Sequence, residues 1–138
     1  YKQNNPLPYK ELIFPDVLKV LNEVKSQGLK IGLASSSVKA DIFRALEENR
    51  LQGFFDVVLS GEEFKDSKPN PEIYLTALKQ LNVQANRALI IEDSEKGIAA
   101  GVAAGVEVWA IKDNRFGMDQ SAAKGLLDSL TDVLDLIK

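Results

Sequence analysis

The stretch Arg87 to Ala100, RALIIEDSEKGIAA, decides the fold, because a buried strand in it ends at two acidic residues and a helix of small residues follows. Ala88 to Ile91 form a short apolar run rich in branched side chains, which is typical of a parallel strand covered on both faces. Ser94 is placed to cap the helix. Glycines at intervals of four would let that helix lie close to the sheet: Gly97, Gly101 and Gly105.

The two acids, Glu92 and Asp93, follow the strand at the sheet edge where open α/β sheets bind ligands. Adjacent carboxylates repel each other and lose hydration energy, so they need a cation or a basic partner. A magnesium ion, Mg2+, would serve, because it prefers hard oxygen ligands. The alternative reading of these residues is an acidic turn with a helix cap.

Composition limits the chemistry. The chain has 138 residues, 45% hydrophobic and 27% charged, which is typical of one folded domain and includes no run long enough to span a membrane. A net charge of -3 makes nucleic acid a poor partner. The absence of cysteine is compatible with a reducing cytoplasm, and the absence of histidine excludes a histidine base or metal ligand within this chain.

Hydrophobic periodicity predicts alternating helices and strands along the rest of the chain. The expected helices are 17–26, 38–49, 72–80, 95–104 and a closing helix at 126–137, and the expected strands are 30–34, 55–59, 88–91 and 106–111. Asp16 would cap the first helix, Gly28 would end it, and Ile42, Phe43 and Leu46 would form the buried stripe of the second. This alternation predicts an α/β fold with a mostly parallel sheet and helices on both faces.

Two further groups follow strands and should meet the acids at the same edge. Ser35, Ser36 and Ser37 precede a helix, where backbone N–H groups and a hydroxyl can hold a phosphate, although Ser37 could simply cap that helix. Lys68 lies in SKPNPEIY, where Pro69 and Pro71 follow it and stiffen the loop, so its ammonium could neutralise phosphoryl oxygens.

The segments GLASSS (32–37), SGEEFKDSKPNPEIYLTAL (60–78) and IIEDSEKGIAAGVAAG (90–105) resemble the haloacid dehalogenase superfamily, in particular its β-phosphoglucomutase-like branch of phosphatases and phosphomutases. The resemblance spans roughly residues 14–111 and implies a three-layer, Rossmann-like core. It implies Mg2+-dependent phosphoryl transfer through an aspartyl phosphate, on a small phosphorylated metabolite such as a sugar phosphate.

The resemblance also implies roles for single residues. Ser35 and the N–H of Ser36 would bind phosphate, and Lys68 would be catalytic and bind phosphate as well. Asp93 would be the magnesium ligand, with Glu92 as a second ligand, either direct or through water.

The chain departs from the family pattern at one large feature. Family members carry an N-terminal strand ending in Asp-x-Asp, which supplies the nucleophile and the acid/base, and no Asp-x-Asp occurs here. That strand would lie between the strands ending at Ser35 and Glu92. We therefore expect residues 1–12 to be a linker from an absent cap domain and residues 13–138 to be the C-terminal part of the core. The chain alone should be inactive, because its nucleophile lies in a missing N-terminal segment.

Other functions remain open at this stage. One alternative is a catalytically inactive remnant or interaction module, which would keep the fold without turnover. A second is a receiver domain, which would need an aspartate at the end of a central strand. A third is a carbon–halogen hydrolase, which would not need the acid pair. Val38 and Lys39 follow the serines where β-phosphoglucomutase has lysine and then asparagine, which argues against that exact activity. The expected location is the cytoplasm.

Overall fold

The computed structural model describes residues 17–112, 117 and 119–137, so the expected linker and the Asp16 cap lie outside the described residues. The helices are α2 (Val17–Ser26), α3 (Lys39–Glu48), α4 (Glu72–Leu81), α5 (Glu95–Ala103) and α6 (Val133–Leu136). The strands are β1 (Gly32–Ser35), β2 (Val57–Ser60), β3 (Leu89–Glu92), β4 (Glu107–Ile111) and β5 (Gly125–Leu127). Single turns of 3-10 helix are η1 (Gly61–Glu63), η2 (Ala85–Arg87) and η3 (Leu130–Asp132).

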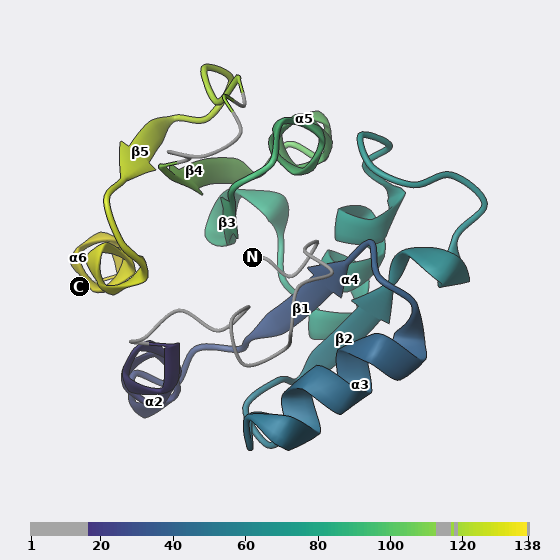
Figure 1. Ribbon diagram of the computed structural model, residues 1–138. Helices are drawn as coiled ribbons and strands as arrows, with labels where there is room; N and C mark the ends of the chain where they lie inside the picture. Colours follow the sequence, from purple (N-terminus) through teal and green to yellow (C-terminus); the bar gives the residue numbers. More distant parts are fainter. Residues whose placement is uncertain (1–16, 113–116, 118, 138) are drawn as a thin grey trace.

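The strands form two parallel sheets (Figure 1). In one, β1 pairs with β2, so that Ser35 lies beside Ser60. In the other, the order is β3–β4–β5, and Glu92 lies beside Ala110. Within the described residues no strand joins β1 to β3. All pairs are parallel, as the alternation of helices and strands predicts.

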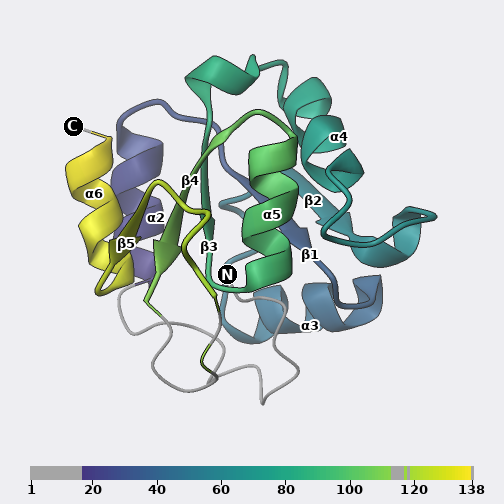
Figure 2. The ribbon, with the colours of Figure 1, turned by 90° about the horizontal axis from the view of Figure 1, so that it is seen from above.

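Helices cover both faces of the β1–β2 sheet, as two views of the ribbon show (Figures 1 and 2). Side chains alternate along each strand, because successive residues of a strand point to opposite faces. Ala34 and Val57 pack into a core with residues of α4 and α5. Leu33 and Val58 pack into a second core with residues of α2 and α3. The predicted three-layer α/β architecture is therefore confirmed.

Small residues bring α5 against the second sheet. A Cβ atom at Gly101 would lie 2.6 Å from Val108 Cγ2 on β4, so no larger residue fits there without a shift of the helix. Gly105 follows the end of the helix with φ +81°, a conformation that glycine adopts at little cost. The close approach at Gly101 was predicted from the spacing of the glycines.

Two sequence predictions are wrong. Residues 126–137 do not form one helix, because Gly125–Leu127 add a strand to β4 and the helix begins only at Val133. A Cβ atom at Gly125 would overlap the Trp109 ring, which lies over this glycine. Phe43 is not part of the buried stripe of α3, since 47% of it is exposed.

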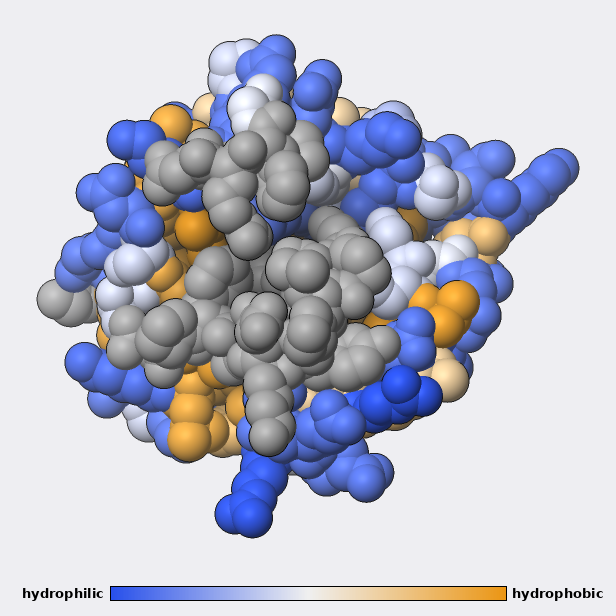
Figure 3. Space-filling model, in the orientation of Figure 1, coloured by the Kyte–Doolittle hydropathy of each residue, from blue (hydrophilic) through white to orange (hydrophobic). Residues whose placement is uncertain are grey.

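A cavity of about 850 Å³ is lined by the facing edges of the two sheets, with residues 31–35 on one side and 88–91 on the other. The walls are mostly apolar and include residues of α2, α3 and α6. In Figure 3 hydrophobic side chains are visible in several places on this face, among largely hydrophilic ones. None of the described helices is long and apolar enough to cross a membrane.

Candidate active site

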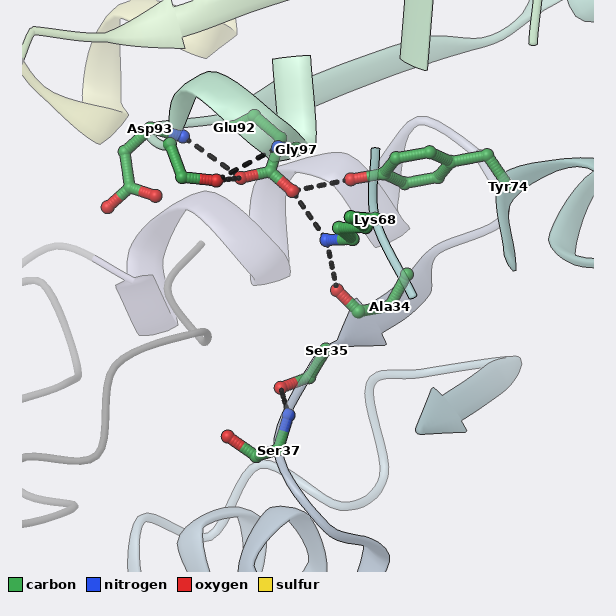
Figure 4. Close-up of polar contacts among 9 residues, drawn as sticks. Ala34, Ser35, Ser37, Lys68, Tyr74, Glu92, Asp93 and Gly97 are labelled. Atoms are coloured by element: carbon green, nitrogen blue, oxygen red, sulfur yellow. Dashed lines mark hydrogen bonds and ion pairs between the residues drawn. The ribbon is translucent and has the colours of Figure 1, made fainter. Parts of the chain in front are cut away.

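Lys68 lies between the two sheets and contacts the carboxyl ends of both (Figure 4). Its Nζ donates to Glu92 Oε2 at 2.6 Å, at the end of β3, and to the carbonyl oxygen of Ala34 at 3.2 Å, beside Ser35 in β1. Pro69 and Pro71 follow it in the same loop, and α4 begins directly after them. The carboxyl ends of β1 and β3 therefore lie at a common edge, as the sequence predicts, and the Lys68 ammonium lies between them.

The carboxylate of Glu92 is fully buried and receives hydrogen bonds on both oxygens. Lys68 and the hydroxyl of Tyr74 both donate to Oε2, each at 2.6 Å. The backbone N–H of Asp93 donates to Oε1 at 3.1 Å, and the Ser94 hydroxyl donates to the same oxygen at 3.4 Å. A buried carboxylate needs this many donors to offset its lost hydration.

These contacts set the charges of the cluster. Burial is the largest single effect on Glu92 and opposes its negative charge, but nearby positive charge, chiefly the Lys68 ammonium, and the hydrogen bonds from Lys68 and Tyr74 together outweigh it, so the pKa of this carboxyl lies below its ordinary value. Burial, followed by the charge of Glu92, raises the pKa of Tyr74 well above its ordinary value. Tyr74 therefore remains a neutral donor, and the Glu92 carboxylate remains ionised near neutral pH.

The start of α5 leaves room for this carboxylate. Ser94 caps the helix by accepting from the N–H of Gly97 at 3.0 Å, as predicted. A Cβ atom at Gly97 would overlap all three carboxylate atoms of Glu92. The glycine spacing in the sequence thus serves the site as well as the packing of the helix.

The serine loop after β1 is held by the turn that follows β2. Ser35 is buried, and its hydroxyl accepts from the N–H of Ser37 at 3.1 Å. The Ser60 hydroxyl donates to the carbonyl oxygen of Ser37 at 2.7 Å. The cap position of α3 is Val38, so the alternative that Ser37 caps this helix is wrong. Ser36 is exposed and lies in this turn, which the hydrogen bonds of Ser35 and Ser60 hold in place.

Asp93 lies beside the cluster but is oriented differently. Its half-buried carboxylate points away from Lys68 (Figure 4), and no partner for it is recorded in the described part of the chain. The Gln120 side chain donates to its carbonyl oxygen at 2.9 Å and to that of Ile111 at 2.8 Å, which fixes the backbone here. Among the described residues no three acids cluster closely enough to hold a metal ion, so Asp93 would need oxygen ligands from elsewhere.

The structure brings together Lys68, Glu92 and the first of the serines, as the sequence predicts, and adds a residue that the sequence did not indicate. Tyr74 in KPNPEIY reads as an ordinary apolar position of α4. A signal was available, because a tyrosine on the buried face of a helix needs a partner for its hydroxyl. Glu92, expected at the metal, instead faces Lys68 and Tyr74 in this structure.

Comparison with known proteins identifies the family of this chain. Residues 4–111 match the family described as haloacid dehalogenase-like hydrolase. A phosphorylated carbohydrates phosphatase of Thermotoga maritima is 39% identical over 93 residues, which cover 67% of this chain and 43% of that protein. The pyrophosphatase PpaX of Bacillus thuringiensis is 27% identical over an alignment of 143 residues with gaps, which covers 99% of this chain and 66% of that protein. The chain thus spans less than two thirds of these relatives.

Solved structures show the same architecture. A Thermotoga maritima protein, provisionally assigned as a β-phosphoglucomutase, superposes with a TM-score of 0.81 at 32% identity, covering 90% of this chain and 60% of that one. The CbbY protein of Rhodobacter sphaeroides, solved with xylulose-(1,5)-bisphosphate, gives 0.76 at 27% identity, covering 84% of this chain and 53% of that one. Both the match to residues 4–111 and these structures indicate that the chain belongs to the haloacid dehalogenase-like hydrolases, in their β-phosphoglucomutase-like branch.

Proposed function

We propose that this chain is the C-terminal part of the core of a magnesium-dependent enzyme that transfers a phosphoryl group of a small phosphorylated metabolite, such as a sugar phosphate, through an aspartyl phosphate. The observation that carries the proposal is the Lys68 ammonium, held between Glu92 and the carbonyl of Ala34 beside Ser35. A cytoplasmic location, expected from a sequence without cysteine, belongs to the same proposal.

Each group at this edge has a part in the proposed reaction. An aspartate oxygen attacks phosphorus, the bond from phosphorus to the metabolite oxygen breaks, and water later hydrolyses the aspartyl phosphate. Lys68 neutralises charge on the phosphoryl oxygens, because its two recorded bonds leave one N–H of the ammonium for a ligand. The Ser35 hydroxyl and the Ser36 N–H orient the phosphoryl group.

Asp93 suits a magnesium ligand, because its carboxylate is a hard oxygen donor at the carboxyl end of β3 and faces away from Lys68. Bound Mg2+ would supply neutralisation of phosphoryl charge. We assign Glu92 to Lys68 rather than to the ion, since both of its oxygens accept bonds from protein donors. The remaining magnesium ligands would come from the nucleophile strand.

That strand would occupy the cavity between β1 and β3. The cavity lies between two parallel sheets whose facing edges, at residues 31–35 and 88–91, are apolar. A parallel strand there would pair with both edges and deliver its last residues beside Lys68. The relatives, which are longer than this chain, leave room for such a strand. We call this chain together with its proposed N-terminal segment, which includes that strand, the whole protein.

The metal assignment is tested by Asp93→Asn in the whole protein, with Asp66→Asn as the matched control in an exposed loop. Turnover of p-nitrophenyl phosphate is measured against magnesium concentration. We expect Asp93→Asn to raise the magnesium concentration for half-maximal activity at least about tenfold, the loss typical of one removed metal-site group. Equal behaviour of the two variants would place the ion elsewhere. The 138-residue chain alone should show no turnover, because it lacks the nucleophile.

A further inference from the structure

Tyr74 is a buried polar residue in direct contact with both charged groups of the site. It is 8% exposed, and its hydroxyl donates at 2.6 Å to Glu92 Oε2, the same oxygen that accepts from Lys68. The Lys68 Nζ also lies 5.0 Å from the centre of the Tyr74 ring. One side chain therefore contacts the anion through its hydroxyl and the cation through its ring.

The Tyr74 hydroxyl is a second donor to Glu92 Oε2, and it changes how strongly this oxygen binds the Lys68 ammonium. If Lys68 were the sole donor to Oε2, the carboxylate would bind the ammonium more strongly and leave less of its positive charge for another ligand. The Tyr74 hydroxyl takes part of the charge of that oxygen, because a hydrogen bond to an ionised acceptor is strong in a buried site. The ring face meanwhile limits where the ammonium can move.

We propose that Tyr74 is a positioning residue for phosphoryl transfer, which acts through Glu92 to keep the Lys68 ammonium in place and available to the phosphoryl group. The inference rests on the proposed function and adds to it a residue that never touches the substrate. It distinguishes the hydroxyl, which acts on Glu92, from the ring, which packs in the core with Ile73 and Leu59.

The first test is a double-mutant cycle in the whole protein with Tyr74→Phe, Lys68→Met and both changes together. Tyr74→Phe keeps the ring and removes only the hydroxyl. We expect kcat and kcat/KM to fall together, about tenfold, with KM unchanged, because one hydrogen bond to a charged group is lost and the effect falls on the transition state. In the Lys68→Met background the same change should cost less than about twofold, since the two residues act together. An equal loss in both backgrounds would overturn the inference.

The second test needs no activity and uses the 138-residue chain. The Lys68 ammonium protons are followed by nuclear magnetic resonance in the wild type and in Tyr74→Phe, with backbone amide spectra to verify the fold. We expect a downfield shift of the Lys68 protons, because Oε2 loses the Tyr74 donor that it shares with Lys68. If the Lys68 signal is the same in the wild type and in Tyr74→Phe while the whole protein is active, the role proposed for Tyr74 is overturned. A shifted signal with every form of the whole protein inactive would overturn the proposed function instead.

Discussion

Two lysine–carboxylate pairs in this chain have similar geometry and opposite surroundings. Lys25 and Asp56 are 2.9 Å apart, with side chains 34% and 39% exposed, and they join the end of α2 to the start of β2. Lys68 and Glu92 are 2.6 Å apart, with side chains 3% and 0% exposed. Exposed pairs contribute little to folding, whereas buried pairs cost hydration energy that their attraction barely offsets. A buried pair at the sheet edge is therefore better explained by chemistry than by stability.

The largest expected effect comes from breaking one pair and then the other. Lys68→Ala should lower the free energy of unfolding of this chain by about 3–5 kcal/mol, because it leaves Glu92 buried without its cation. Lys25→Ala should change it far less, because water screens the Asp56 that remains. Urea unfolding of both variants measures the difference. Similar losses would show that burial does not separate the two pairs.

A smaller effect is expected from the space around Glu92. Gly97→Ala should destabilise the chain by about 1–3 kcal/mol, because its Cβ overlaps the buried carboxylate and forces a shift. Gly53→Ala is the control, since a Cβ atom there meets nothing within 4 Å and its stability should be unchanged or slightly higher. If Gly97→Ala unfolded at the same urea concentration as the wild type, Glu92 would be less constrained than the contacts indicate.

The smallest effect concerns the pH dependence of the exposed pair. The N–H of Ile31 and the Lys25 ammonium hold the pKa of Asp56 below its ordinary value. Its folded pKa is below the unfolded value of about 3.9, so ionised Asp56 stabilises the chain above that pH and the contribution is lost as the pH falls through the folded pKa.

Asp56→Asn should therefore make the melting temperature less sensitive to pH between about 5 and 3, where the carboxyl takes up its proton. Thermal unfolding followed by circular dichroism at a series of pH values measures this slope. The wild type should lose more stability than Asp56→Asn as the pH falls. Parallel slopes would mean that the Asp56 contacts contribute nothing in solution.

The sequence predicted the sheet edge because the ends of the strands follow from hydrophobic periodicity. It could not say which way each acid points. Glu92 and Asp93 are neighbours in an extended chain, and neighbours in such a chain face opposite sides. Only the packing of α4 and α5 decides that Glu92 faces Lys68 and Tyr74 while Asp93 faces away.

The C-terminal strand was missed for a related reason. A three-residue strand has too few positions to show an alternating pattern, and Leu126 and Leu127 are also compatible with a helix. The contact that decides between them is the Trp109 ring over Gly125, which joins residues distant in the sequence. Local patterns therefore predicted the elements, and the long-range contacts required the structure.

The central claim is that the buried pair serves catalysis rather than folding, and one comparison in the whole protein tests it most directly. Replacing Lys68 by Met, Glu92 by Leu and Tyr74 by Phe together removes both charges and the hydroxyl, and fills the site with apolar groups. The control removes the exposed pair with Lys25→Met and Asp56→Leu.

Turnover and urea unfolding are measured on both variants. The apolar triple variant should be as stable as the wild type or more stable, because apolar groups often replace a buried ion pair without loss. Its turnover should fall at least about a hundredfold, the cost of losing one preorganised charge at the transition state, while the control keeps normal turnover. A stable triple variant with normal turnover would contradict the account.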